Sequence, residues 1–305
     1  MPKSSSAARA CSVAVAALLA VFRAAPAHAA LTGSDRLSAA YELILSAQFE
    51  RAEAEIRKAC PPAPAEACQV LGVVELWWQI QIDPDSRLRD ALLNQRARAS
   101  IDAADAWTRR APSNAEAWFY LAGSYAPLVQ WQVLRGERLN AARNGNRVRV
   151  ALEEALRLDP TLADAHFGVG IYEYYADVAS AAAKMFRWLF LLPGGDRVRG
   201  LQAIDETRKS GSLLRSEADF QRYLIDIWYE HKPEEALAIL RTLDARYPTN
   251  PIFLQRIAET YDVYLHDRTS SAAAWQTLID RASRDRVYDA ARVRALADRK
   301  RRALF

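Results

Sequence analysis

Glycine and cysteine are scarce in this chain, and their scarcity narrows the fold classes that it can adopt. The 305 residues include only 11 glycines and 3 cysteines. Glycine destabilises helix interiors, whereas alanine, leucine and arginine, which are abundant here, are strong helix formers. The composition therefore predicts a mostly helical chain, and about 275 residues beyond the N-terminal segment are ample for a large apolar core.

The sequence also lacks the motifs that identify common enzyme classes. It contains neither a Gly-x-Ser-x-Gly nucleophile elbow nor a phosphate-binding Gly-x-x-x-x-Gly-Lys loop. His166, His231 and His266 are far apart, and no His-x-x-x-His pair places two metal ligands on one helical face. We therefore expect no catalytic residue, no metal and no cofactor, and we expect that the protein is not an enzyme.

The N-terminal 30 residues have the pattern of a secretory signal peptide. Lys3 and Arg9 precede the apolar run 13–22, which leads to the small-residue segment 27–30. We expect cleavage after Ala29 or Ala30 and export to the periplasm or the exterior. An uncleaved anchor is the alternative, although the apolar run is shorter than the roughly 20 residues that a spanning helix needs.

The net positive charge of the whole chain comes partly from this N-terminal segment. Residues 1–30 carry Lys3, Arg9 and Arg23 and no acidic residue, so the remaining chain has a formal charge three below the +4 of the full sequence. A charge near +1 gives no overall attraction to nucleic acid. We expect no nucleic-acid partner.

Two cysteines remain beyond the N-terminal segment. Cys60 and Cys68 flank the proline-rich segment 61–67, which breaks a helix. In an oxidising compartment, this pair is expected to form a structural disulfide that joins the end of one helix to the start of the next. Two thiols without a nearby histidine fall short of the four ligands of a structural zinc site.

A repeated apolar pattern occupies Glu217–Tyr261. The spacing that begins at Phe220 restarts at Pro251, and the corresponding positions Phe220 and Leu254 are 34 residues apart. This is the period of the tetratricopeptide repeat (TPR), and the chain resembles a member of that family. The resemblance implies an all-α, right-handed solenoid of helix pairs that binds proteins or peptides, here over residues 31–288, with residues 289–305 as a basic capping helix.

The units before this repeat are longer than the family period. The segment Ala65–Cys68 recurs as Ala115–Trp118 after 50 residues and as Ala163–His166 after another 48. Each segment follows a proline and is expected to begin a helix. The extra length lies near residues 82–92 and 130–146, and it predicts extended helices or ordered loops.

Smaller signals suggest how these helices begin and approach one another. Ser113 and Glu116 have the spacing of a capping box, and Asn250 before Pro251 is the expected cap of a later helix. Gly72, Ala122 and Gly170 occupy the position where paired helices approach closely in the family. A close approach of backbones is therefore expected at these three residues.

The TPR register places nine residues in or beside a concave partner-binding groove. Aromatic side chains on such a surface supply a large contact area for a bound peptide. The alternative is that the long insertions fill the groove and bury these rings as core. The nine residues are Trp77, Phe119, Phe167, Tyr174, Tyr175, Gln221, Trp228, Tyr229 and Gln255.

The expected function is a non-enzymatic interaction scaffold of the cell envelope that binds a protein or peptide. The lysine and asparagine residues with which the family grips a C-terminal carboxylate are absent, since Gln221, Arg222, Gln255 and Arg256 stand in their places. The alternative function is a structural or peripheral membrane subunit. It would use the apolar stretch 181–192 or the basic C-terminal tail.

Overall fold

The computed structural model describes residues 31–178 and 194–305, and within these ranges it contains helices and no strands. The expected signal peptide and the apolar stretch 181–192 lie outside the described residues. The elements, in chain order, are α1 (Ser34–Leu45), α2 (Phe49–Ala59), α3 (Ala65–Ile82), α4 (Asp90–Arg110), α5 (Ala115–Leu134), α6 (Arg138–Leu158), α7 (Ala163–Val178), α9 (Arg197–Ser210), α10 (Arg215–Trp228), α11 (Pro233–Arg246), α12 (Pro251–Glu259), the π-helical turn η1 (Thr260–Tyr264), α13 (Arg268–Ser283) and α14 (Ala290–Arg302).

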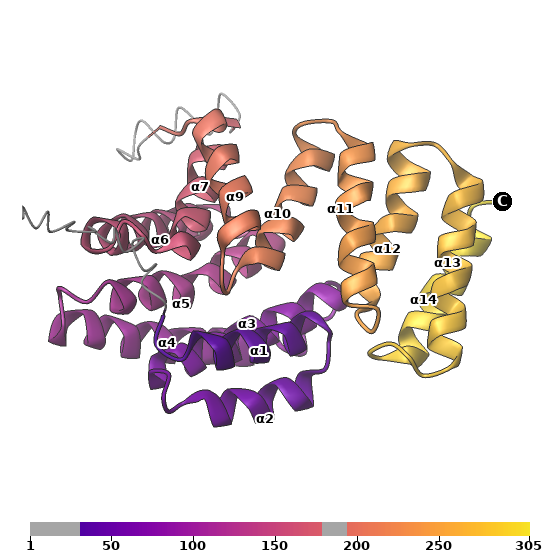
Figure 1. Ribbon diagram of the computed structural model, residues 1–305. Coiled ribbons are helices and arrows are strands. Elements are labelled where there is room, and N and C mark those ends of the chain that lie inside the picture. Colours follow the sequence, from indigo (N-terminus) through magenta and orange to yellow (C-terminus); the bar gives the residue numbers. More distant parts are fainter. Residues whose placement is uncertain (1–30, 179–193) are drawn as a thin grey trace, which may run out of the picture.

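Neighbouring helices in the sequence are also neighbours in space. The closest associations include α5 with α6, α7 with α9, α10 with α11 and α13 with α14 (Figure 1). Short turns connect most of these helices, which is the arrangement expected for antiparallel helix pairs. The prediction of an all-helical fold is confirmed for the residues that the structure describes.

The extra length of the upstream units lies in extended helices. Helices α4, α5 and α6 have 21, 20 and 21 residues, whereas α10 and α11 have 14 each. Only residues 135–137 separate α5 from α6. The prediction of longer helices is therefore right for this pair, and residues 83–89 form the loop between α3 and α4.

Side-chain caps mark the starts of four of these helices, among them α12 and α5. The Asn250 side chain accepts a hydrogen bond from the Ile252 amide at the start of α12, as the sequence predicts. At α5 the predicted Ser113 cap is wrong. Asn114 occupies the cap position, and its side chain accepts from the amides of Glu116 and Ala117. An asparagine oxygen at this position satisfies the same free amides that a serine hydroxyl would.

Helices α7 and α9 approach closely through glycines. A Cβ at Gly170 would lie 2.9 Å from the Gly200 carbonyl oxygen, and a Cβ at Gly200 would lie 2.7 Å from the Gly170 carbonyl oxygen. Each residue would clash with backbone if it carried a side chain, so the close approach predicted at Gly170 is confirmed. The same prediction is wrong at Gly72, where an added Cβ would meet no atom within 4 Å.

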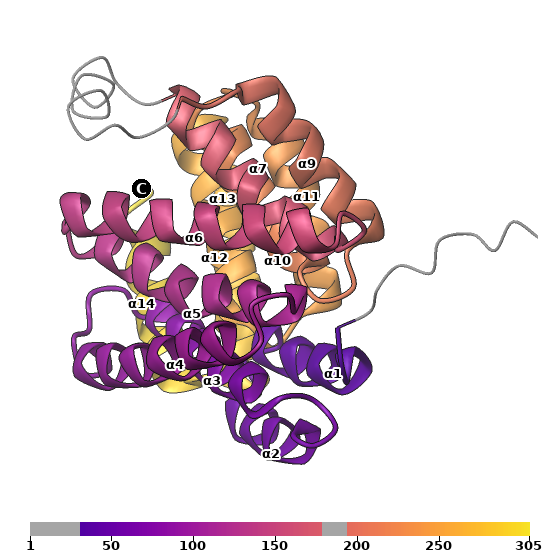
Figure 2. The ribbon, with the colours of Figure 1, turned by 90° about the vertical axis from the view of Figure 1, so that its left-hand side faces the viewer.

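The first helices pack against the last ones. The Asn250 side chain donates to the Leu45 carbonyl at 2.8 Å, and the Phe49 and Tyr288 rings are 4.8 Å apart. Between them, the buried Trp78 ring on α3 lies 5.2 Å from Phe220. In Figures 1 and 2, α3 lies below α10. The core is therefore built from segments far apart in the sequence.

Candidate functional site

A half-open pocket of about 120 Å³ lies among α3, α5, α6, α7 and α10. Trp77, Phe119 and Phe167 belong to three separate hydrophobic clusters of the described residues, and all three rings line the pocket. Ala126 and Gly168 also line it. The small side chain of Ala126 leaves space beside the rings, whereas Leu152 fills the room beside Gly168, where an added Cβ would clash with its Cδ1. The pocket thus lies where the clusters adjoin.

A chain of polar side chains crosses the pocket and links four helices. The Trp77 indole N–H donates to Gln130 Oε1 at 2.9 Å, and Gln221 Nε2 donates to the same oxygen at 3.4 Å. Gln221 Nε2 also lies 3.2 Å from Glu217 Oε1, while the Tyr41 hydroxyl donates to Glu217 Oε2 at 2.9 Å. These bonds join α3, α5, α10 and α1 and hold Trp77 in a fixed orientation.

Glu217 is the only acidic residue in this polar chain, and it is buried. Burial raises the pKa of its carboxyl above the ordinary value, although hydrogen bonds from Gln221 and Tyr41 lower it in part. Asp164 also lines the pocket, but its carboxylate accepts from the amides of Leu213 and Leu214. Asp164 therefore holds the start of α10 in place.

The nine residues predicted to bind a partner are distributed over three places. Trp77, Phe119 and Phe167 line the pocket and are buried, and the buried Gln221 belongs to its polar chain. A second group contains Tyr174, Tyr175, Trp228 and Tyr229. Gln255 is buried in another pocket, near α14. Partner binding by these residues stays a prediction, and most of their rings serve as core, the alternative noted above.

The second group is a cluster of tyrosines beside an exposed tryptophan. The rings of Tyr174, Tyr175 and Tyr229 meet edge to face, with centroids 5.4–6.0 Å apart. Trp228 is 53% exposed, and Tyr174 is fully buried. The Tyr174 hydroxyl donates to Glu230, which also pairs with Arg197. This cluster thus joins α7 to the end of α10.

Sequence reasoning did not identify several of the residues that shape the pocket. Gln130 and Glu217 connect its polar chain, and Tyr120 lines it with a buried hydroxyl that has no partner among the described residues. A buried polar group without a hydrogen bond costs free energy. Glu217 occupies a helical position that the repeating pattern reserves for apolar residues. This departure from the pattern is the signal in the sequence that would have located the site.

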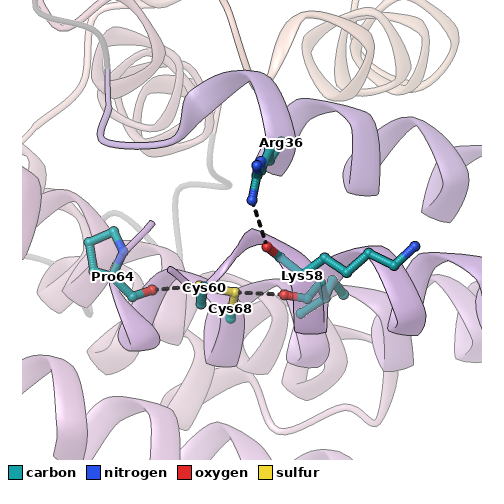
Figure 3. Close-up of a disulfide and its surroundings, with 6 residues drawn as sticks. Arg36, Lys58, Cys60, Pro64 and Cys68 are labelled. Atoms are coloured by element: carbon teal, nitrogen blue, oxygen red, sulfur yellow. Dashed lines mark hydrogen bonds between the residues drawn. A yellow bond between two sulfur atoms is a disulfide. The ribbon is translucent and has the colours of Figure 1, made fainter. Parts of the chain in front are cut away.

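The predicted disulfide between Cys60 and Cys68 is present, with Cα atoms 6.3 Å apart (Figure 3). Cys60 ends α2, and Cys68 lies in the first turn of α3, so the bond joins successive helices as expected. Arg36 on α1 donates to the nearby Lys58 carbonyl at 3.0 Å. A disulfide is compatible with an oxidising compartment.

Searches of the described residues for a metal site and for a spanning helix give no candidate. No group of three or more histidine, cysteine, aspartate or glutamate side chains in residues 31–178 and 194–305 is arranged to hold a metal ion. In the same ranges, no helix is both long and apolar enough to span a bilayer.

No protein-family model matches this chain. A search of curated proteins likewise finds no significant match.

Proposed function

We propose that this protein is a non-enzymatic interaction module of the cell envelope that binds an extended segment of a partner protein. The observation that supports the proposal is the pocket lined by Trp77, Phe119 and Phe167. Three of the residues selected from the TPR register meet there, although they belong to different hydrophobic clusters. The pocket is the proposed anchor site for one apolar side chain of the partner.

The size of the pocket favours a single apolar side chain. Its volume of about 120 Å³ is comparable to engineered apolar protein cavities of roughly 150 Å³ that bind benzene. Fully burying a leucine or phenylalanine side chain contributes about 1.5–3 kcal/mol. Such an anchor is typical of the few residues that dominate the binding energy of protein interfaces.

The polar chain beside the rings supplies groups that suit a peptide backbone. Gln130 presents an amide group at the pocket, and this group has both donor and acceptor atoms. A bound segment exchanges hydrogen bonds with it while its side chain enters the apolar space. Burial raises the pKa of Glu217 and so disfavours a negative charge beside an apolar ligand.

The architecture that we infer for this function is a TPR-like, right-handed solenoid. Support comes from the 34-residue spacing and from the matching helix pairs α10–α11 and α12–α13. The inferred location is the periplasm or the exterior. This inference rests on the N-terminal sequence pattern and is supported by the disulfide between Cys60 and Cys68.

A variant that fills the pocket tests the proposal without removing a core ring. Ala126 lines the pocket and is half-buried on α5, so Ala126→Leu places new carbon atoms in the empty space. Peptides selected from a random library on the wild-type protein are then titrated by fluorescence anisotropy. We expect Ala126→Leu to weaken binding by about tenfold or more, because the anchor no longer enters.

The control is Ala238→Leu, which makes the same chemical change at an exposed position of α11. Circular dichroism establishes that both variants fold, and Ala126→Met provides a less bulky filling if the leucine destabilises the protein. Wild-type affinity should persist in Ala238→Leu. Equal binding by all variants would contradict the anchor pocket, and a failure to select any peptide would contradict the proposed function.

A further inference from the structure

A second pocket, of about 330 Å³, lies where the end of α3 meets α12 and α14. Helices α3 and α12 contact each other, and Arg292 at the start of α14 pairs with Asp83 just beyond α3. Figure 1 shows α12 and α14 at the end of the molecule formed by the last helices. The pocket is separate from the proposed anchor site, with which it shares no lining residue.

Basic side chains dominate the helix that forms one wall of this pocket. Helix α14 carries six basic residues and one acidic residue, Asp298. Four basic residues line the pocket: Arg256, Arg292, Arg299 and Lys300. Three acidic residues also line the pocket, so its formal excess is one positive charge, to which the other basic residues of α14 add.

Ion pairs within the pocket leave a net excess of positive charge. Arg256 pairs with Glu259, and Arg292 pairs with Asp83. No ion pair is found for Arg299 or Lys300 within the described ranges, and Asp85 is the one remaining acidic residue of the lining. Arg292 also donates to the Ile82 carbonyl at 3.1 Å, which covers the negative end of α3.

Two amide groups in the lining have unused hydrogen-bonding capacity. Gln255 is only 8% exposed, and its Nε2 is buried without a partner among the described residues. Gln81 also lines the pocket, and its Nε2 is likewise buried without a hydrogen-bond partner among the described residues. A buried donor without an acceptor is unfavourable. A ligand with several acceptor oxygens would relieve this cost at both glutamines.

We propose that this pocket binds a small organic phosphate. The phosphoryl oxygens accept hydrogen bonds from Arg299, Lys300 and the amides of Gln81 and Gln255, and the organic part occupies the remaining space. Phosphate suits this set of groups because its three or more oxygens can accept several donors at once, whereas a carboxylate has two. The volume also exceeds by several-fold the roughly 30 Å³ that one water occupies in the liquid.

Calorimetric titration with phenyl phosphate, phenylacetate and inorganic phosphate tests the assignment. Phenyl phosphate is expected to bind the wild-type protein more tightly than phenylacetate. The double variant Arg299→Gln/Lys300→Gln should lose about tenfold or more in affinity, since two charge-assisted hydrogen bonds disappear. Gln255→Leu should also weaken binding, although it leaves the charge of the protein unchanged.

The matched control is Arg286→Gln/Arg294→Gln, which removes the same charge at exposed positions outside the pocket. Unchanged affinity in this control supports the site. Inorganic phosphate that binds as tightly as phenyl phosphate also supports a phosphoryl site, with free phosphate as its source. Absent binding, equal affinity for phenylacetate, or equal losses in the two double variants would overturn the proposal.

Discussion

Glu75 is a buried acidic side chain on α3 outside both pockets, and it gives the protein a titratable core position. Burial raises its pKa from 4.5 to about 7, and the nearby charge of Glu53 acts in the same direction. Gln79 donates a hydrogen bond to its Oε1 at 3.0 Å, which favours the ionised form in part. The proton that Glu75 retains therefore links folding stability to pH.

The expected effect is a loss of stability as the pH rises from about 4.5 to about 7. In this window the unfolded chain has released the proton and the folded chain still holds it, so ionisation favours unfolding. Glu75→Gln removes this linkage. At pH 8 we expect the variant to be more stable than the wild type by on the order of 1 kcal/mol, and at pH 4.5 we expect little difference.

Urea unfolding at the two pH values measures this difference. The exposed Glu235→Gln serves as the control, since it makes the same change on the surface of α11. If the free energy of unfolding changed by the same amount between the two pH values in Glu75→Gln and in the wild type, the role assigned to Glu75 would be wrong.

At the scale of helices, Arg135 ties the end of α5 to the loop between α3 and α4. Its guanidinium makes two bonds of 2.8 Å to the Asp90 carboxylate and also donates to the carbonyls of Pro84 and Ser86. The Arg135 and Asp90 side chains are 8% and 15% exposed. Four donated bonds at a buried position fix this loop against the helix.

Removal of this arginine is expected to be strongly destabilising. Arg135→Met leaves the Asp90 carboxylate buried without its partner and should lower the free energy of unfolding by about 3 kcal/mol. Arg109→Met, which breaks an exposed pair with Asp105, should cost less than about 0.5 kcal/mol. Chemical denaturation compares the two variants. Similar small losses would show that Arg135 does not anchor the loop.

The disulfide acts at the same scale, since it constrains the connection between α2 and α3. The cysteines are eight residues apart, and closing a loop of this length is expected to contribute about 2–3 kcal/mol through the unfolded state. We expect the double variant Cys60→Ser/Cys68→Ser to be less stable by this amount. Thermal unfolding with and without reductant measures it. Reductant should then affect the wild type and leave the variant unchanged.

At the scale of the whole molecule, local patterns predicted the helices well. The apolar spacing and the prolines placed the starts of α3, α5 and α7 within the observed helices, and Asn250 was identified as a cap. The pairing of Cys60 with Cys68 was also predictable, because only two cysteines remain beyond the N-terminal segment. These features depend on residues close together in the sequence.

The packing of the first helices against the last was not predicted. The bonds from Tyr247 to Glu42 and from Asn250 to Leu45 join residues about 205 positions apart. Contacts between such distant residues leave no periodic pattern in the sequence. The aromatic residues at the TPR groove positions were therefore expected to line a groove, whereas many of them are buried. The pocket shows the same limit, because the polar chain that contains Glu217 and Gln130 is assembled from four different helices.

The central claim is that the pocket between α3, α5 and α7 receives an apolar side chain of a partner. The indole N–H of Trp77, which donates to Gln130 at the pocket, provides a direct reporter. We propose to follow the indole signals by ¹⁵N NMR during titration with a selected peptide. The Trp77 signal should move in the wild type and in Ala238→Leu and stay in place in Ala126→Leu. Movement of the exposed Trp228 signal alone, with Trp77 unchanged, would contradict the claim.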